Sequence, residues 1–168
     1  RNLTPRQVYD VNRLGVPGLA FQREERRVYP HGSLAAHIVG FTNIDNRGLA
    51  GVERQFDDSL IAGSKPLDLS LDVRVQHVLE EELAAAQEEF SAIGAAGIVM
   101  DVVTGEVLAV ASLPGFDPNH PVAGADDTRF NRATLGVYEM GSTFKIFTTA
   151  MALDAGTVTM RGGYDATN

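Results

Sequence analysis

Ser142 and Lys145 are the residues whose types and spacing most directly suggest chemistry. From Phe144 onward apolar residues recur at helical spacing until Gly156, so the pattern predicts a helix that begins near Ser142. Residues three apart on a helix lie on the same side. We therefore expect the Ser142 hydroxyl and the Lys145 amine to lie within hydrogen-bond distance of each other.

Two interpretations of Ser142 compete at this point. A serine at a helix start is often an N-cap, and a capping box would place Glu or Gln three residues later. Lys145 occupies that position instead, where the positive end of the helix dipole disfavours a charged amine. A neutral amine beside a hydroxyl can take its proton, which activates serine as a nucleophile. Ser-x-x-Lys matches are common by chance. The choice between an N-cap and a nucleophile therefore depends on motifs elsewhere in the chain.

The composition excludes several classes of function. The 168 residues, 44% apolar and without cysteine, suit one domain or two small ones and exclude disulfides and thiolate metal sites. A net charge of −8 and a pI near 4.9 argue against nucleic-acid binding and against a basic membrane-surface patch. No apolar run approaches the roughly 18 residues of a membrane span, and no signal-peptide pattern is present.

Neither the histidines nor the glycines predict a ligand site. The four histidines lack ligand spacing such as i, i+4 on one helix. The glycines form no phosphate-binding loop. We therefore expect no metal ion and no organic cofactor.

The first part of the chain predicts short elements joined by loops. A capping box at Thr4 predicts a helix that ends at Gly15. Residues 19–29 are expected to be extended, with their run of charged residues on a solvated strand face. An amphipathic helix is predicted over 52–62, and a brief strand over 67–71.

The longest predicted helix spans 73–90, with Asp72 as its N-cap. Its buried stripe is expected to consist of Val75, Val78 or Leu79, Leu83, Ala86 and Phe90. The opposite face carries four glutamates that we interpret as solvated rather than metal-binding: Glu80, Glu81, Glu88 and Glu89.

Two apolar, β-branched runs, 95–102 and 106–112, predict a hairpin with Gly105 at positive φ in its turn. Both runs are apolar along nearly their whole length, so both faces are expected to need cover. A two-stranded hairpin is marginal alone, and an open apolar edge tends to pair with another chain. We expect these 168 residues by themselves to self-associate through 95–112, or to lie beside further protein.

Taken together, these segments resemble a class B penicillin-binding protein. Five motifs occur in the order found in that family: 27–32 with 36–41, 48–53 with 56–57, 69–76, 101–109 with Pro114 and 117–119, and 129–145. Residues 40–45 are most similar to the division-specific branch, which makes septal peptidoglycan. Met140 is a departure, because the family usually has proline before Gly-Ser.

The resemblance implies an α+β fold in two parts. Residues 1–71 correspond to the C-terminal part of a membrane-proximal, dimerisation-type pedestal domain. Residues 72–168 correspond to the N-terminal part of the penicillin-binding transpeptidase domain, an antiparallel sheet packed with helices. The family's Ser-x-Asn and Lys-Thr-Gly motifs do not follow Lys145. The resemblance therefore implies further chain after residue 168, and an earlier transmembrane helix that anchors the protein at the periplasmic face of the bacterial inner membrane.

The resemblance also implies an activity. Ser142 attacks the D-Ala-D-Ala unit of a peptidoglycan stem peptide, releases D-alanine, and forms an acyl-enzyme that an amine of a neighbouring stem resolves. Lys145 is the expected base, although the base is disputed in related enzymes. The Ser142 N–H and one from the Lys-Thr-Gly strand bind the oxyanion. β-Lactams acylate Ser142, division or wall-synthesis proteins are partners, and these 168 residues alone are expected to be inactive.

Two alternatives remain open. The chain also resembles class D β-lactamases around Ser142, which allows a β-lactam hydrolase or sensor, although the motifs over 27–53 argue against it. Residues 1–71 also allow a non-catalytic interaction module of the division complex. Arg27 and Glu53 can pair across this part, but we expect them to be unpaired surface charges.

Overall fold

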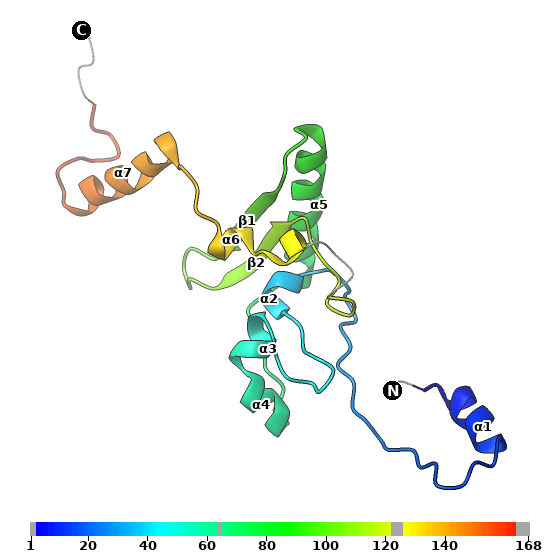
Figure 1. Ribbon diagram of the computed structural model, residues 1–168. Helices are drawn as coiled ribbons and strands as arrows, with labels where there is room; N and C mark the ends of the chain where they lie inside the picture. The colour runs from blue at the N-terminus through cyan, green and yellow to red at the C-terminus, as the bar shows by residue number, and fades with distance from the viewer. Residues whose placement is uncertain (1–2, 64, 122–125, 164–168) are drawn as a thin grey trace. The chain divides into compact units, whose positions relative to one another are not determined.

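The computed structural model describes residues 3–63, 65–121 and 126–163, which fold into two compact units, Arg1–Leu135 and Gly136–Asn168. Helices and an antiparallel two-stranded sheet occur together, so the α+β class is confirmed (Figure 1). The elements of the first unit are α1 (Pro5–Arg13), α2 (Ala36–Val39), α3 (Gly51–Gln55), α4 (Asp57–Ala62), α5 (Val73–Glu89), β1 (Ala95–Met100), β2 (Val107–Leu113), the 3-10 helix η1 (Asp126–Arg129) and α6 (Arg132–Leu135).

Local sequence signals place the starts of α1 and α5 as predicted. The Thr4 hydroxyl accepts from the Gln7 N–H, and the Gln7 side chain accepts from the Thr4 N–H at 2.8 Å, which completes the capping box. The Asp72 carboxylate accepts from the Arg74 N–H at 2.9 Å and caps α5. Each cap satisfies N–H groups that have no partner inside the helix.

Three predictions in the first part of the chain are wrong. Residues 19–29 form no strand, and neither do residues 67–71. The helix expected over 52–62 is two helices, α3 and α4, which meet at Phe56. The division occurs where the Asp57 carboxylate turns back to accept the Gly48 N–H at 2.8 Å.

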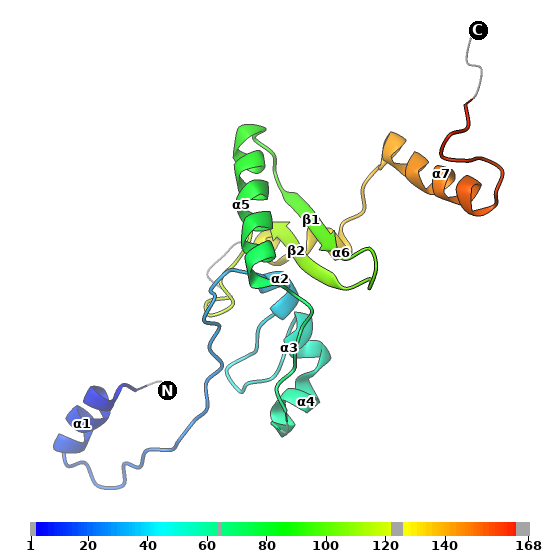
Figure 2. The same cartoon turned by 180° about the vertical axis from the view of Figure 1, so that it is seen from behind.

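The predicted hairpin is confirmed as β1 and β2, joined by a turn in which Gly105 has a φ of +76°. Helix α5 lies along one face of this hairpin (Figures 1 and 2). Gly97 permits the close approach, because a Cβ there would meet the Leu79 and Leu83 side chains at 3.0 and 3.1 Å. Ala111, which pairs with Gly97, is buried against the same helix. Small residues on this face therefore set the helix-to-sheet distance.

The buried face of α5 differs from the prediction at several positions. Of the two alternatives Val78 and Leu79, Leu79 faces the hairpin and Val78 is 56% exposed. Phe90 is 74% exposed, so its place in the predicted stripe is wrong. The most buried residue is Gln76, which is 1% exposed, and Glu80 lies half-buried on the same side. The interpretation of Glu80 as solvated is therefore wrong. The helix is rotated so that polar side chains reach the edge of β2.

Residues 70–76 close the outer edge of β2. The Asp72 N–H donates to the Leu108 carbonyl at 2.9 Å, and the Gln76 side chain bonds both backbone groups of Val110. Among the described residues, none pairs with the outer edge of β1, and Ile98 on its solvent face is 53% exposed. Self-association through residues 95–112 therefore stays a prediction.

The second unit contains the 3-10 helix η2 (Gly141–Phe144), which continues directly into α7 (Lys145–Asp154). The helix predicted from the spacing after Phe144 is confirmed. The large apolar side chains of η2 and α7 are exposed: Phe144, Ile146, Phe147 and Met151. The Phe144 and Phe147 rings contact each other at 5.4 Å. Among the described residues, the second unit therefore has no buried apolar core around η2, which carries Ser142, and α7.

We predict that Gln76→Leu destabilises the protein by several kcal/mol in a denaturant titration. Leucine has a similar volume but leaves both backbone groups of Val110 unpaired, at a cost of roughly 1–3 kcal/mol for each. Gln87→Leu is the matched control, because Gln87 on the same helix makes a single exposed bond to the Ala92 carbonyl. Equal losses in the two variants would show that the Gln76 amide contributes nothing specific.

Candidate active site and its supporting network

The structure brings Ser142 and Lys145 together. Lys145 Nζ lies 3.1 Å from Ser142 Oγ, and both residues are exposed in the second unit. A charged amine donates across this distance, whereas a neutral amine accepts the hydroxyl proton. The contact arises within one turn, since Ser142 lies in η2 and Lys145 begins α7. The pair can therefore act as nucleophile and base.

Ser142 does not act as an N-cap in this structure. The N-cap position of η2 is Met140, and no side chain caps that turn. Gly141 precedes Ser142 with a φ of +53°, a conformation that favours glycine. The first N–H groups of a helix have no partner within it. The N–H of Ser142 belongs to such a turn and can donate to an oxyanion.

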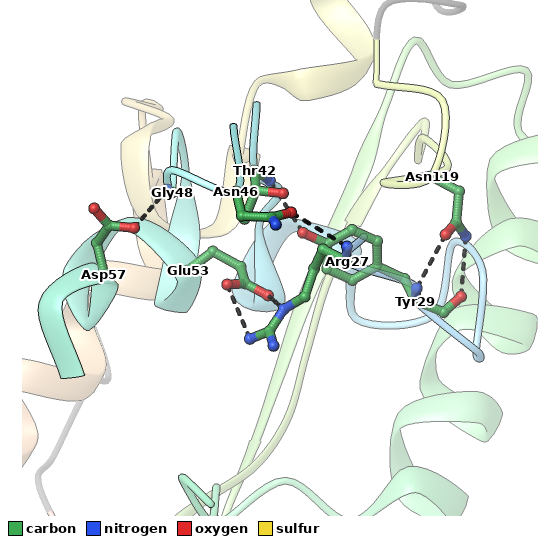
Figure 3. A network of polar contacts seen from close by, with 8 residues as sticks. All are labelled: Arg27, Tyr29, Thr42, Asn46, Gly48, Glu53, Asp57 and Asn119. Atoms are coloured by element: carbon green, nitrogen blue, oxygen red, sulfur yellow. Dashed lines mark hydrogen bonds and ion pairs between the residues drawn. The ribbon is translucent and has the colours of Figure 1, made fainter. Parts of the chain in front are cut away.

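An ion pair between Arg27 and Glu53 lies at the centre of a polar network in the first unit (Figure 3). Arg27 Nε donates to Glu53 Oε1 at 2.6 Å, and Nη2 donates to Oε2 at 3.1 Å. Glu53 is 5% exposed. Its carboxylate raises the pKa of the Arg27 guanidinium above the usual value, mainly through these hydrogen bonds. The expectation of unpaired surface charges is wrong.

Asparagine side chains hold the backbone that carries Arg27 (Figure 3). Asn46 accepts from the Arg27 N–H at 3.3 Å and donates to the Glu25 carbonyl at 2.9 Å. Asn119 accepts from the Tyr29 N–H at 3.0 Å and donates to the Tyr29 carbonyl at 2.9 Å. The Tyr29 hydroxyl accepts from the Thr42 N–H at 3.0 Å. Side-chain amides therefore satisfy the groups that a neighbouring strand would otherwise bond.

His37 links α2 to residues close to α6. Its Nε2 lies 2.8 Å from the Thr128 carbonyl oxygen, and its ring meets Phe116 edge-on at 5.1 Å. Because a carbonyl oxygen only accepts, Nε2 carries the proton. Burial lowers the pKa of His37 below its usual value of 6.5, and Arg132 adds to the effect, whereas Glu80 and the Thr128 carbonyl oppose it.

Within the described part of the chain, no group of three or more His, Cys, Asp or Glu side chains is arranged to hold a metal ion. None of the described helices is long and apolar enough to cross a membrane.

Comparison with known proteins identifies the family. The profile of the penicillin binding protein transpeptidase domain matches residues 95–166. The chain is 49% identical over 168 residues to a probable peptidoglycan D,D-transpeptidase FtsI of Caulobacter vibrioides, covering 98% of this chain and 28% of that protein. The chain belongs to the class B penicillin-binding proteins. The match to that domain begins at β1 and includes Ser142 and Lys145.

Other peptidoglycan D,D-transpeptidases match over nearly the same part of the chain. Identity to a probable peptidoglycan D,D-transpeptidase PenA of Neisseria gonorrhoeae is 36%, covering 93% of this chain and 32% of that one. Identity to the peptidoglycan D,D-transpeptidase FtsI of Escherichia coli is 32%, with coverages of 94% and 31%. The chain thus spans about a third of the length of these relatives.

The fold also matches the solved structure of a peptidoglycan synthetase. The crystal structure of a peptidoglycan synthetase from Bifidobacterium adolescentis superposes with a TM-score of 0.67, covering 99% of this chain and 36% of that one, at 22% sequence identity. At this identity the likeness concerns the fold alone.

Sequence reasoning predicted the contact between Ser142 and Lys145 but missed the residues that support the first unit of this class B protein: Gln76, Glu80, Asn46, Asn119 and His37. One signal was available for Gln76, which lies between Val75 and Leu79 on the apolar side of a strongly periodic helix. An amide at such a position indicates a buried polar contact. No comparable signal marks Asn46 or Asn119, whose partners lie far away in sequence.

We predict that Arg27→Met destabilises the protein more than Glu53→Gln does. The first change leaves a buried carboxylate without its partner, whereas the second leaves a guanidinium whose side chain is 42% exposed. We expect a loss of about 2 kcal/mol for Arg27→Met, less than the roughly 3–5 kcal/mol of a fully buried pair, because water screens the arginine. Denaturant titration measures both losses. The reverse order would contradict the importance of Glu53 burial.

We predict that folding stability falls as pH decreases below about 6.5, partly because of His37. The folded protein holds the His37 proton less tightly than the unfolded chain, so the unfolded state binds more protons in that range and becomes favoured. His37→Gln removes this contribution and should flatten the dependence of the melting temperature on pH between 7.5 and 5.5. Glu80 and Arg132, which act on His37, remain in both proteins. Parallel curves would contradict the prediction.

Proposed function

We propose that this chain belongs to a peptidoglycan D,D-transpeptidase that cross-links peptide stems during septal wall synthesis and is acylated by β-lactams. The observation that supports the proposal most directly is the 3.1 Å contact between Lys145 Nζ and Ser142 Oγ at the start of α7. The names of the relatives, among them the FtsI of Escherichia coli, agree with this activity. The substrate is a stem peptide that ends in D-Ala-D-Ala.

The proposed reaction has two steps. In the first, Ser142 Oγ bonds to the carbonyl carbon of the penultimate D-alanine, and the bond to the terminal D-alanine breaks. The hydroxyl proton passes to a neutral Lys145 and then to the departing amine. In the second, an amine of a neighbouring stem bonds to the same carbon, the ester bond breaks, and Ser142 recovers a proton. The Ser142 N–H stabilises the oxyanion in both steps.

We propose residues 1–71 as part of a pedestal domain and residues 72–168 as part of the transpeptidase domain. Hydrogen bonds join these parts within the first unit: the Ala35 N–H donates to Glu80 at 2.9 Å, and the Tyr29 backbone bonds Asn119. We also propose that the protein acts at the periplasmic face of the inner membrane, beside other division or wall-synthesis proteins.

We predict that Ser142→Ala abolishes covalent labelling of the full-length protein by a fluorescent penicillin, because the attacking oxygen is removed. Lys145→Met should slow acylation by about 10²–10⁴-fold through the loss of the base. Thr143→Ala is the matched control, since it removes a hydroxyl from the same turn and should leave labelling intact. Labelling is measured by gel fluorescence and by mass spectrometry of the acylated peptide. Normal labelling of Ser142→Ala would refute the proposal.

A further inference from the structure

Residues 127–132, which we call the anchor segment, are held by hydrogen bonds from two other parts of the first unit. The Ser112 hydroxyl on β2 donates to the Phe130 carbonyl at 3.2 Å and accepts from the Arg132 N–H at 2.9 Å. Ser112 is 3% exposed. From α2, His37 donates to the Thr128 carbonyl at 2.8 Å. A strand and a distant helix thus fix the same short segment.

The Arg132 side chain strengthens this arrangement. Its Nη2 donates to Asp127 Oδ2 at 2.6 Å, and its side chain is only 12% exposed. A Cβ on Gly94 would lie 2.4 Å from Arg132 Nε, so the side chain packs directly against the backbone that enters β1. Helix α6 begins at Arg132 and contacts both strands. The anchor segment is therefore bonded at both ends and packed on the hairpin.

The covalent connection to Ser142 leaves the first unit directly after the anchor segment and helix α6. Helix α6 ends at Leu135, and Ser142 follows seven residues later. A displacement of the anchor segment moves the origin of this connection. Displacements near 1 Å at a nucleophile can cost up to about 10²-fold in rate.

We propose that His37 is a positioning residue for acylation, which ties α2 to the anchor segment and so fixes the origin of the connection to Ser142. This inference rests on the proposed function. The contact joins residues 91 positions apart. It connects α2, which packs on α3, to the segment that precedes the connection to Ser142. His37 touches no reacting atom. Its role is to restrict the positions available to the connection.

The test compares three variants of the full-length protein in stopped-flow acylation by a chromogenic β-lactam. His37→Gln keeps an N–H donor near the Nε2 position, whereas His37→Phe keeps an aromatic ring against Phe116 but loses the donor. His37→Asn, whose shorter amide falls near Nδ1, loses the Thr128 contact without adding apolar surface. We expect the acylation rate constant to fall about tenfold in the Phe and Asn variants and to stay close to that of the wild type in the Gln variant.

Further measurements separate positioning from folding. The dissociation constant of the initial complex and the melting temperature should change little in whichever of the Phe and Asn variants folds. Equal rates in all three variants, slow acylation in Gln alone, or a loss explained by the unfolded fraction would overturn the role of His37 while labelling of Ser142 still supports the proposed function. Absence of acylation at Ser142 in the wild type would overturn both.

Discussion

The side-chain amide of Gln76 takes the place of a β-strand on the outer edge of β2. Its oxygen accepts from the Val110 N–H at 2.9 Å, and its nitrogen donates to the Val110 carbonyl at 2.8 Å and to Glu80 at 2.7 Å. Glu80 in turn accepts from the Ala35 N–H at 2.9 Å. Because unpaired buried polar groups are costly, helix α5 can occupy only the rotation and height that satisfy all of these groups. This chain of bonds joins α2, α5 and the hairpin.

Side-chain amides also replace a neighbouring strand at residues 19–29, which were expected to form a strand. Asn46 and Asn119 bond the outward backbone groups of Arg27 and Tyr29, which a neighbouring strand would otherwise satisfy. These residues form no strand, and the partners of their backbone groups are single side chains. A strand needs a ladder of backbone partners, whereas an amide needs only one residue at the right place. These bonds fix the backbone of Arg27 and so position its side chain to pair with Glu53.

Local signals predicted most of what depends on neighbours in sequence. The caps at Thr4 and Asp72, the hairpin, and the contact of Ser142 with Lys145 all follow from residues a few positions apart. The errors share a different cause. Glu80 is half-buried because of Ala35, 45 residues away, and Arg27 is paired because of Glu53, 26 residues away. Periodicity contains no information about which distant backbone group a polar side chain will meet.

The candidate site also combines a contact that the local sequence predicts with long-range contacts that it does not predict. The Ser142–Lys145 contact is generated within one helical turn, so a chain can retain the pair even where little else packs around it. Catalysis requires more than the pair, because the nucleophile must also be oriented toward a substrate carbonyl within a fraction of an ångström. That orientation has to come from contacts outside the turn. The bonds of Ser112 and His37 to residues 127–132 are of this long-range kind, and in our proposal they fix the start of the covalent path to Ser142. The chemistry is thus encoded locally, whereas its placement depends on the polar side chains that the sequence pattern did not reveal.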